Sequence, residues 1–349
     1  MSPENQSTES NESTALDTFG ATIGSMITGI AVPEPVQRNA FKAFGRLCTA
    51  LVEVPVAALE GVVAERRAES QARVKLISVT ADQLAAQLKV DPQLAEAASN
   101  RYGARIVRQQ ENLNRVSAIA LDALKANSTK SGDAREGVEQ AAADEIDTDW
   151  LNVFETEAAE KSSEQMQMLF GKILAGEVRR PKSFSIKTLR LISQLDANTA
   201  QLFKHLCSLS VSLQTPSAHL VDVRVCSLGG NAASNALQSY GLSFDNLNTL
   251  QEFGLVISDY NSHMGYGMCI AHQNEITLPL VFEGCPYGLV PKAETKPSQD
   301  FRIAGVALSL AGRELFPIVD IEPDERYRTA LQEYLDKAGF TMQMVDSAT

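Results

Sequence analysis

The clearest pattern of apolar positions along the chain lies in its middle. Apolar residues there recur three and four positions apart, a spacing that places them on one face of an α-helix. Two more helices with the same spacing follow closely, so residues 146–211 are predicted to form a small helical bundle. The first of these helices carries Met166, Leu169, Phe170, Ile173 and Leu174 on its apolar face.

Helix start and stop signals support this bundle. Ser162 and Gln165 have the spacing of a capping box. Gly176 is expected to end the first helix in a left-handed conformation, and Pro181 prevents the helix from resuming. Asp196 is a good N-cap for the last helix of the bundle. The polar residues of this region therefore have structural explanations.

After residue 212 the hydrophobic period changes from helical to alternating. A strand, a glycine-rich turn, a helix, further strands and a final helix follow in an order typical of a winged helix. Residues 212–349 are therefore predicted to form a winged-helix-like domain, and the whole chain an α+β fold that is mostly helical. The expected strands are residues 220–226, 275–282 and 301–310, and the expected helices are residues 245–253 and a final helix from Pro323 to Gly339.

The N-terminal third contains an unusual apolar segment. Residues 19–32 carry no charge and are shorter than the roughly 20 residues that span a bilayer. They suit an interfacial or re-entrant helix, and a small-xxx-small pair lets two helices approach closely. The alternative is a helical hairpin within residues 19–64 that packs on the protein or on a second copy. The candidate residues for membrane contact or self-association are Phe19, Gly20, Ile23, Gly24, Ile27, Gly29 and Ile30.

An amphipathic helical arm is predicted for residues 65–126. Arg101, Arg105, Arg108 and Arg115 place a basic stripe on it, which is either a solvated face or a contact for anionic lipid or acidic protein. Residues 127–145 have the composition of a linker.

Composition and charge narrow the function further. The formal net charge of −12 argues against a general nucleic-acid binder, because phosphate affinity depends on basic side chains. Five irregularly spaced cysteines indicate a reducing compartment rather than a disulfide framework. Residues 1–18 form an acidic tail, expected to be disordered, without the basic start of a secretory signal. The expected location is the cytoplasm, with peripheral contact to the inner membrane as an extension.

The sequence predicts no catalytic, cofactor-binding or metal-binding residues. His263, Cys269, His272 and Cys285 are metal-ligand types, but their spacing matches no standard finger. Residues 294–296 have the acid-x-Lys form found in metal-dependent nucleases, yet they lie between prolines and no positioned aspartate precedes them. The candidate recognition helix, residues 243–253, carries acids and no Lys or Arg, which argues against DNA binding.

Two stretches resemble a known family. Residues 164–207 (EQMQMLFGKILAGEVRRPKSFSIKTLRLISQLDANTAQLFKHLC) and 308–319 (LSLAGRELFPIV) resemble the bacterial domain of unknown function 2806. They are more distantly similar to the abortive-infection alpha group, which has a comparable passage of helix, LAGE-like stop, serine and helix. The resemblance implies no catalytic residues. The distant group is associated with defence against phage and often has a membrane-tending N-terminal half.

The sequence therefore predicts a non-enzymatic protein that associates with itself or with a membrane through its N-terminal region. Its C-terminal domain is expected to bind a protein partner, in a phage-defence setting. The alternatives are a winged-helix transcription regulator and a metal-dependent nuclease. No cofactor is expected.

Overall fold

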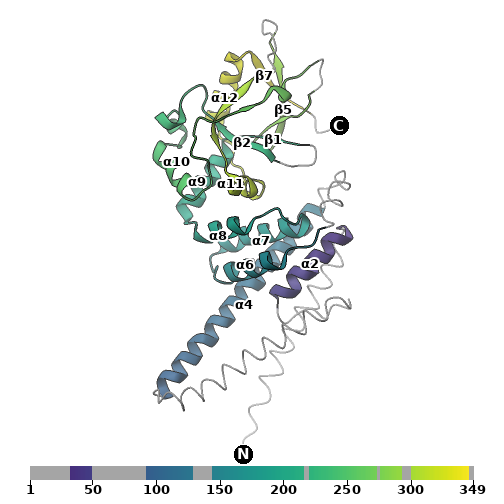
Figure 1. The fold of residues 1–349 in the computed structure, drawn as a ribbon, viewed down its shortest axis with the longest axis vertical. Coiled ribbons are helices and arrows are strands. Elements are labelled where there is room, and N and C mark those ends of the chain that lie inside the picture. The colour runs from purple at the N-terminus through teal and green to yellow at the C-terminus, as the bar shows by residue number, and fades with distance from the viewer. Residues whose placement is uncertain are drawn as a thin grey trace, which may run out of the picture. The chain divides into compact units, whose positions relative to one another are not determined.

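The protein is described by a computed structural model that covers residues 32–48, 92–128, 144–215, 220–272, 276–292 and 300–345. The chain divides into two compact units between Leu189 and Arg190, called here the helical unit and the sheet unit. The first contains helices, and the second contains a seven-stranded antiparallel sheet with further helices (Figure 1). The prediction of an α+β fold that is mostly helical is confirmed.

The helical unit is built from α2 (Glu34–Leu47), α4 (Pro92–Ser128), α6 (Thr148–Ala159) and α7 (Glu164–Arg179). A short connection makes α6 and α7 an antiparallel hairpin. The helices α4 and α7 run in the same direction, since Asn112 bonds to Gln167 and Ile119 lies against Gly171 farther along both helices. Their shared core contains Phe44, Val116, Leu124, Trp150, Phe154, Phe170, Ile173 and Leu174, all buried.

Close approach between α4 and α7 depends on one glycine. A Cβ atom at Gly171 would lie 2.5 Å from Ile119 Cγ2 and 3.2 Å from the Val116 carbonyl oxygen. Such a contact is shorter than van der Waals packing allows, so the two backbones can be this close only without a side chain at position 171.

Two of the expected helix signals are wrong. The N-cap of α7 is Ser163, whose hydroxyl accepts a hydrogen bond from Met166 N, rather than Ser162. The helix also continues past Gly176 to Arg179. Gly176 has a packing role instead, because a Cβ atom there would lie 2.8 Å from the Phe184 ring. A helical glycine that faces an aromatic ring cannot be told from a stop signal by sequence alone.

The sheet unit follows α8 (Ile186–Gln194), a helix that contains the division between the units. Its strand order is β3-β6-β2-β1-β4-β5-β7, and neighbouring strands are antiparallel. The strands are β1 (Ser210–Gln214), β2 (Leu220–Cys226), β3 (His263–Gly265), β4 (Leu280–Phe282), β5 (Cys285–Pro291), β6 (Arg302–Ala307) and β7 (Phe340–Met344). The helices are α9 (Ala197–Ser208), α10 (Phe244–Glu252), α11 (Leu310–Leu315) and α12 (Glu325–Lys337).

The sheet is larger than the sequence predicts. Strand β2 has the predicted bounds, 220–226, and β4 and β6 fall within the other two predicted strands. Strands β1, β3, β5 and β7 are additional. Asp196 caps α9 as expected, whereas α12 is capped by Asp324 and does not begin at Pro323. Nothing in the described part of the fold establishes the winged-helix arrangement, which stays a prediction.

The sheet also curls back on itself. The chain that leaves β3 forms a parallel bridge from Ile270 to Leu289 of β5, and Ala271 N donates to the Leu289 carbonyl. One end of the strand order is thereby joined to a strand near the other end. The side chains of Tyr266, Cys269 and Leu289 are fully buried at this closure.

Candidate functional site

The first candidate site is the N-terminal half of α4, residues 92–109, called here the α4 extension. It continues beyond the end of the bundle, where α2 stops at Leu47 and α6 at Ala159 (Figure 1). At 1.5 Å per residue the extension is roughly 27 Å long. It therefore presents several helical turns outside the bundle core.

The extension has an apolar face and a basic face. Tyr102, Gly103, Ile106 and Val107 lie on the side that continues the buried face of the bundle, and Tyr102 and Val107 are 53% and 59% exposed. Nothing in the described structure lies within 4 Å of a Cβ atom placed at Gly103. Tyr102 and Val107 lie at the two edges of this apolar side, about 140° apart around the helix axis, with Ile106 and Gly103 between them. An exposed apolar strip of this kind is typical of an interaction surface.

The opposite face carries Arg101, Arg105 and Arg108, all exposed. Arg105 donates to Glu160 Oε1 at 2.6 Å, and Gln109 donates to the same oxygen at 2.8 Å. These hydrogen bonds lower the pKa of the Glu160 carboxyl. The pair is exposed and contributes little to stability. The face therefore stays basic in a protein whose net charge is −12.

The residues predicted for membrane contact or self-association, Phe19 to Ile30, lie outside the described residues. The described residues begin at Val32, shortly before α2, and α2 is bonded to other parts of the bundle. Asn39 donates to the Asp144 carbonyl, and Lys42 forms an ion pair with Glu145 at 3.2 Å. In the part of the chain that the structure describes, no helix is both long and apolar enough to cross a membrane.

The second candidate is a buried ionic cluster in the sheet unit. Arg224 binds Asp222 through two parallel hydrogen bonds of 2.6 and 2.9 Å, and it also donates to the Ser262 and Ile303 carbonyls. The Tyr266 hydroxyl donates to Asp222 at 2.8 Å. Burial, and after it the charge of Asp222, raises the pKa of Tyr266. Because both charges are paired inside the fold, the cluster is suited to holding β2, β3 and β6 together.

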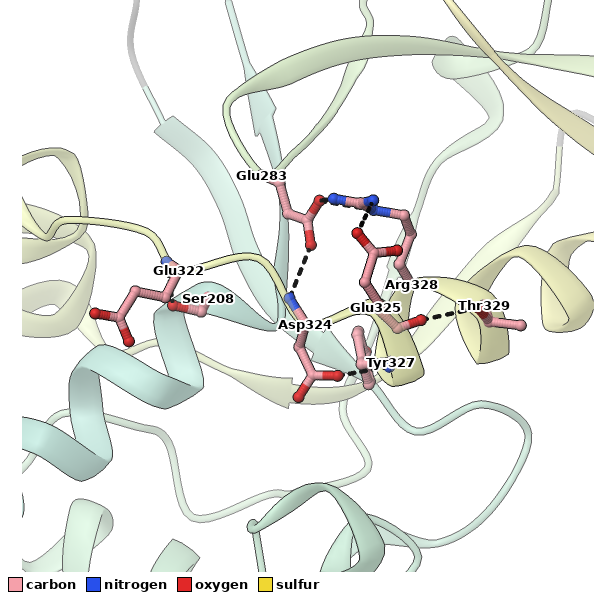
Figure 2. A network of polar contacts seen from close by, with 8 residues as sticks. All are labelled: Ser208, Glu283, Glu322, Asp324, Glu325, Tyr327, Arg328 and Thr329. Atoms are coloured by element: carbon pink, nitrogen blue, oxygen red, sulfur yellow. Dashed lines mark hydrogen bonds and ion pairs between the residues drawn. The ribbon is translucent and has the colours of Figure 1, made fainter.

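The third candidate joins the β4–β5 hairpin to α12 (Figure 2). Glu283 and Gly284 form its two-residue turn with φ angles of 50° and 76°, and this turn type requires both to be positive. The Glu283 carboxylate accepts from Asp324 N at 3.2 Å and from Arg328 Nε at 2.9 Å. Arg328 also pairs with Glu325 at 2.6 Å. Glu283 is therefore fully engaged in fixing the start of α12.

The residues examined for metal or nuclease chemistry do not form a site among the described residues. His263 lies exposed in β3 and bonds to Arg302, whereas Cys269 is fully buried and Cys285 lies half-buried in β5. No group of three or more described His, Cys, Asp or Glu side chains could hold a metal ion. Residues 294–296 fall outside the described residues.

The LAGE motif, residues 174–177, has a structural role. Glu177 is buried, and its carboxylate accepts hydrogen bonds from Lys182 N at 2.6 Å and Phe184 N at 3.1 Å. The Trp150 indole donates to the Phe184 carbonyl at 2.7 Å. The Glu177 carboxylate, the Trp150 indole and the contact of Gly176 with the Phe184 ring therefore hold residues 176–184 in a loop. The LAGE motif shapes a loop rather than a reactive site.

These features define the class of protein: an α+β protein with a helical bundle from which α4 extends beyond the other described helices, and a curled antiparallel sheet around an ionic core. The chain belongs to the family described as protein of unknown function, DUF2806, whose family model matches residues 96–332. The match begins in the α4 extension and ends in α12, and it confirms the resemblance to this family predicted from residues 164–207 and 308–319. It does not confirm the more distant similarity to the abortive-infection alpha group. Neither the curated proteins nor the solved structures gave a match to this chain.

Proposed function

We propose that this protein is a non-enzymatic assembly protein that associates through its N-terminal half and binds a protein partner through its sheet unit. The observation that carries the proposal is the α4 extension, where Tyr102 continues the side of α4 that is buried farther along the helix, Val107 lies at the edge of that side, and both are exposed. Apolar helix surface that no described residue covers is unfavourable for a protein that acts alone.

The association proposed for the N-terminal half is with a second copy or with the inner-membrane surface. A second copy would cover the apolar face, and the arginines opposite it would point away from the contact, so like charges would not meet. An anionic membrane would instead attract Arg101, Arg105 and Arg108. The uncharged residues 19–32 support either form of association.

The proposed setting is phage defence. Its support is the resemblance of the helix, LAGE-like stop, serine and helix passage to the abortive-infection alpha group. The alternative function, a winged-helix transcription regulator, has less support because α10, its candidate recognition helix, carries Asp245 and Glu252 and no basic residue.

The test compares the full-length chain with a Tyr102→Ser/Val107→Ser variant and an Arg101→Gln/Arg108→Gln variant. Mass in solution is measured by sedimentation, and membrane contact by flotation with vesicles of phosphatidylglycerol or of phosphatidylcholine. Self-association predicts that the serine variant has a lower mass than the parent chain, while the glutamine variant keeps the mass of the parent chain. Membrane contact predicts that the glutamine variant loses binding to the phosphatidylglycerol vesicles.

Matched controls are available in the same chain. Met168→Ser removes another exposed apolar side chain of the helical unit, and Lys187→Gln/Arg326→Gln removes two exposed charges elsewhere. A chain that lacks residues 1–31 tests the apolar segment without removing α2, which begins at Glu34. If the full-length chain is monomeric and binds neither vesicle, the proposal is wrong.

A further inference from the structure

β7 is the last strand in the order of the sheet, and no described strand pairs with its outer edge. Val345 N donates to the Pro286 carbonyl, and Lys292 N donates to the Gly339 carbonyl. These two bonds set the phase, that is, which facing pairs of β5 and β7 are hydrogen-bonded to each other. With the register of the pair, this phase directs Thr341 and Gln343 toward β5. The main-chain groups of Phe340, Met342 and Met344 therefore point away from the sheet. No described residue bonds to them there.

Natural sheets usually protect such an edge with charged residues, proline or a very short strand. The opposite edge strand, β3, is only three residues long. In contrast, residues 340–345 read FTMQMV and contain no charge and no proline, and Met344 is 65% exposed. An uncharged open edge with an exposed methionine is suited to pairing with another strand.

We propose that β7 pairs with β7 of a second copy of this chain, antiparallel about a two-fold axis at Met342. The three residues whose main-chain groups point outward are symmetric about this position. Met342 would face Met342 of the second copy, and Phe340 would face Met344 at each end. This arrangement forms about six main-chain hydrogen bonds, two for each facing pair.

The side chains also fit this occupant. Met344 would lie across from Phe340 of the second copy, next to Phe301, whose ring is 4.8 Å from that of Phe340. Methionine sulfur and aromatic rings attract one another, so an exposed thioether would gain a partner. On the other face Gln343 would lie opposite Thr341, and no like charges would meet. A strand of a different protein would need matching chemistry, whereas a second copy supplies it by symmetry.

Site-specific crosslinking tests the pairing. The experiment uses the full chain with Cys285→Ser, because the other four cysteines are buried. In a Met342→Cys variant, facing Cα atoms of a hydrogen-bonded pair would be about 5.5 Å apart, within disulfide reach. In the control variant, Met344→Cys, the two equivalent residues would be separated by roughly 13 Å along the strand. Oxidation should give a covalent dimer at least about tenfold faster from position 342.

This control is demanding because Met344 is exposed and Met342 only half-exposed. Random collisions would therefore favour position 344. Equal or faster crosslinking at position 344 overturns the proposal. As a second test, Met344→Lys should abolish dimers that Gln343→Lys retains, and equal dimer content in both variants contradicts it. The crosslinking readout is specific to β7. The dimer content of the lysine variants is measured in the Tyr102→Ser/Val107→Ser background, so that association through the α4 extension does not contribute to it.

Discussion

The α4 extension and the ionic core of the sheet unit differ in which kinds of side chain they expose and which they bury. The extension exposes Tyr102, although Leu113 and Val116 on the same side of α4 are buried, and it exposes Val107 at the edge of that side. The sheet unit buries Asp222 and Arg224, although charged residues are usually exposed. In the core, every charge has a partner within the fold. In the extension, the partner described for the side chains is Glu160, which accepts hydrogen bonds from Arg105 and Gln109.

This contrast separates stability from association. Substitutions in the ionic core or in the bundle should change the free energy of unfolding. Substitutions in the extension should change binding and leave that free energy almost unchanged. The single tryptophan, Trp150, lies buried in the helical unit. Its fluorescence reports unfolding of that unit, and far-UV circular dichroism also reports the sheet unit.

The largest expected effect follows Arg224→Met. The substitution leaves the Asp222 carboxylate buried without its cation, which should cost about 3–5 kcal/mol of unfolding free energy. Urea unfolding followed by circular dichroism measures the loss. Changing Asp222 to Leu as well should recover a large part of it, since no charge is then left unpaired. A loss below about 1 kcal/mol in the single variant would show that the cluster is not a structural ion pair.

A smaller effect with a diagnostic sign is expected at Gly171. Replacing a helical glycine by alanine normally stabilises a helix by up to about 1 kcal/mol. Gly171→Ala should instead destabilise the bundle by about 1–3 kcal/mol, because the new Cβ atom would lie 2.5 Å from Ile119. Gly103→Ala in the extension is the matched control and should be stabilising or neutral. Urea unfolding followed by Trp150 fluorescence distinguishes them, and the same sign at both positions would contradict the packing described for α4 and α7.

Alkaline pH should weaken the sheet unit. Burial raises the pKa of the Cys226 and Cys269 thiols to about 12. Because the folded pKa is above the unfolded one, these groups contribute full stability below about pH 9, and this contribution is lost as pH rises toward 12. The slope is about 1.4 kcal/mol per pH unit for each thiol. Unfolding of Cys269→Ala between pH 9 and 11 should show a shallower slope, and an unchanged slope would contradict this assignment.

The sequence predicted local features better than distant contacts. The apolar face of α7 and the bounds of β2 were correct, because a helical period and a strict alternation are properties of neighbouring residues. Gly176 was misassigned because its partner, Phe184, approaches through a turn that includes Lys182 with a positive φ. Strand β5 was missed since Pro286 and Gly288 weaken any strand pattern, and only pairing with β4 and β7 establishes it.

In the candidate sites, too, the sequence predicted local features better than distant contacts. The basic stripe of α4 was visible in the sequence, but whether Tyr102 and Val107 are exposed depends on where the other helices end. The turn at Glu283 was missed because glutamate seldom adopts a positive φ. Its side chain bonds to α12, about forty residues later in the chain, and these bonds hold the turn. Such long-range compensation leaves no local signal in the sequence.

The most direct test of the central claim combines two readings on one Tyr102→Ser/Val107→Ser variant. The first is its unfolding free energy from Trp150 fluorescence, and the second is its mass by sedimentation and its binding to phosphatidylglycerol vesicles. The predicted result is a free energy within about 0.5 kcal/mol of the parent chain, together with a lower mass or with loss of vesicle binding. A variant that is strongly destabilised, or that associates as the parent does, would contradict the assignment of the α4 extension as an association surface.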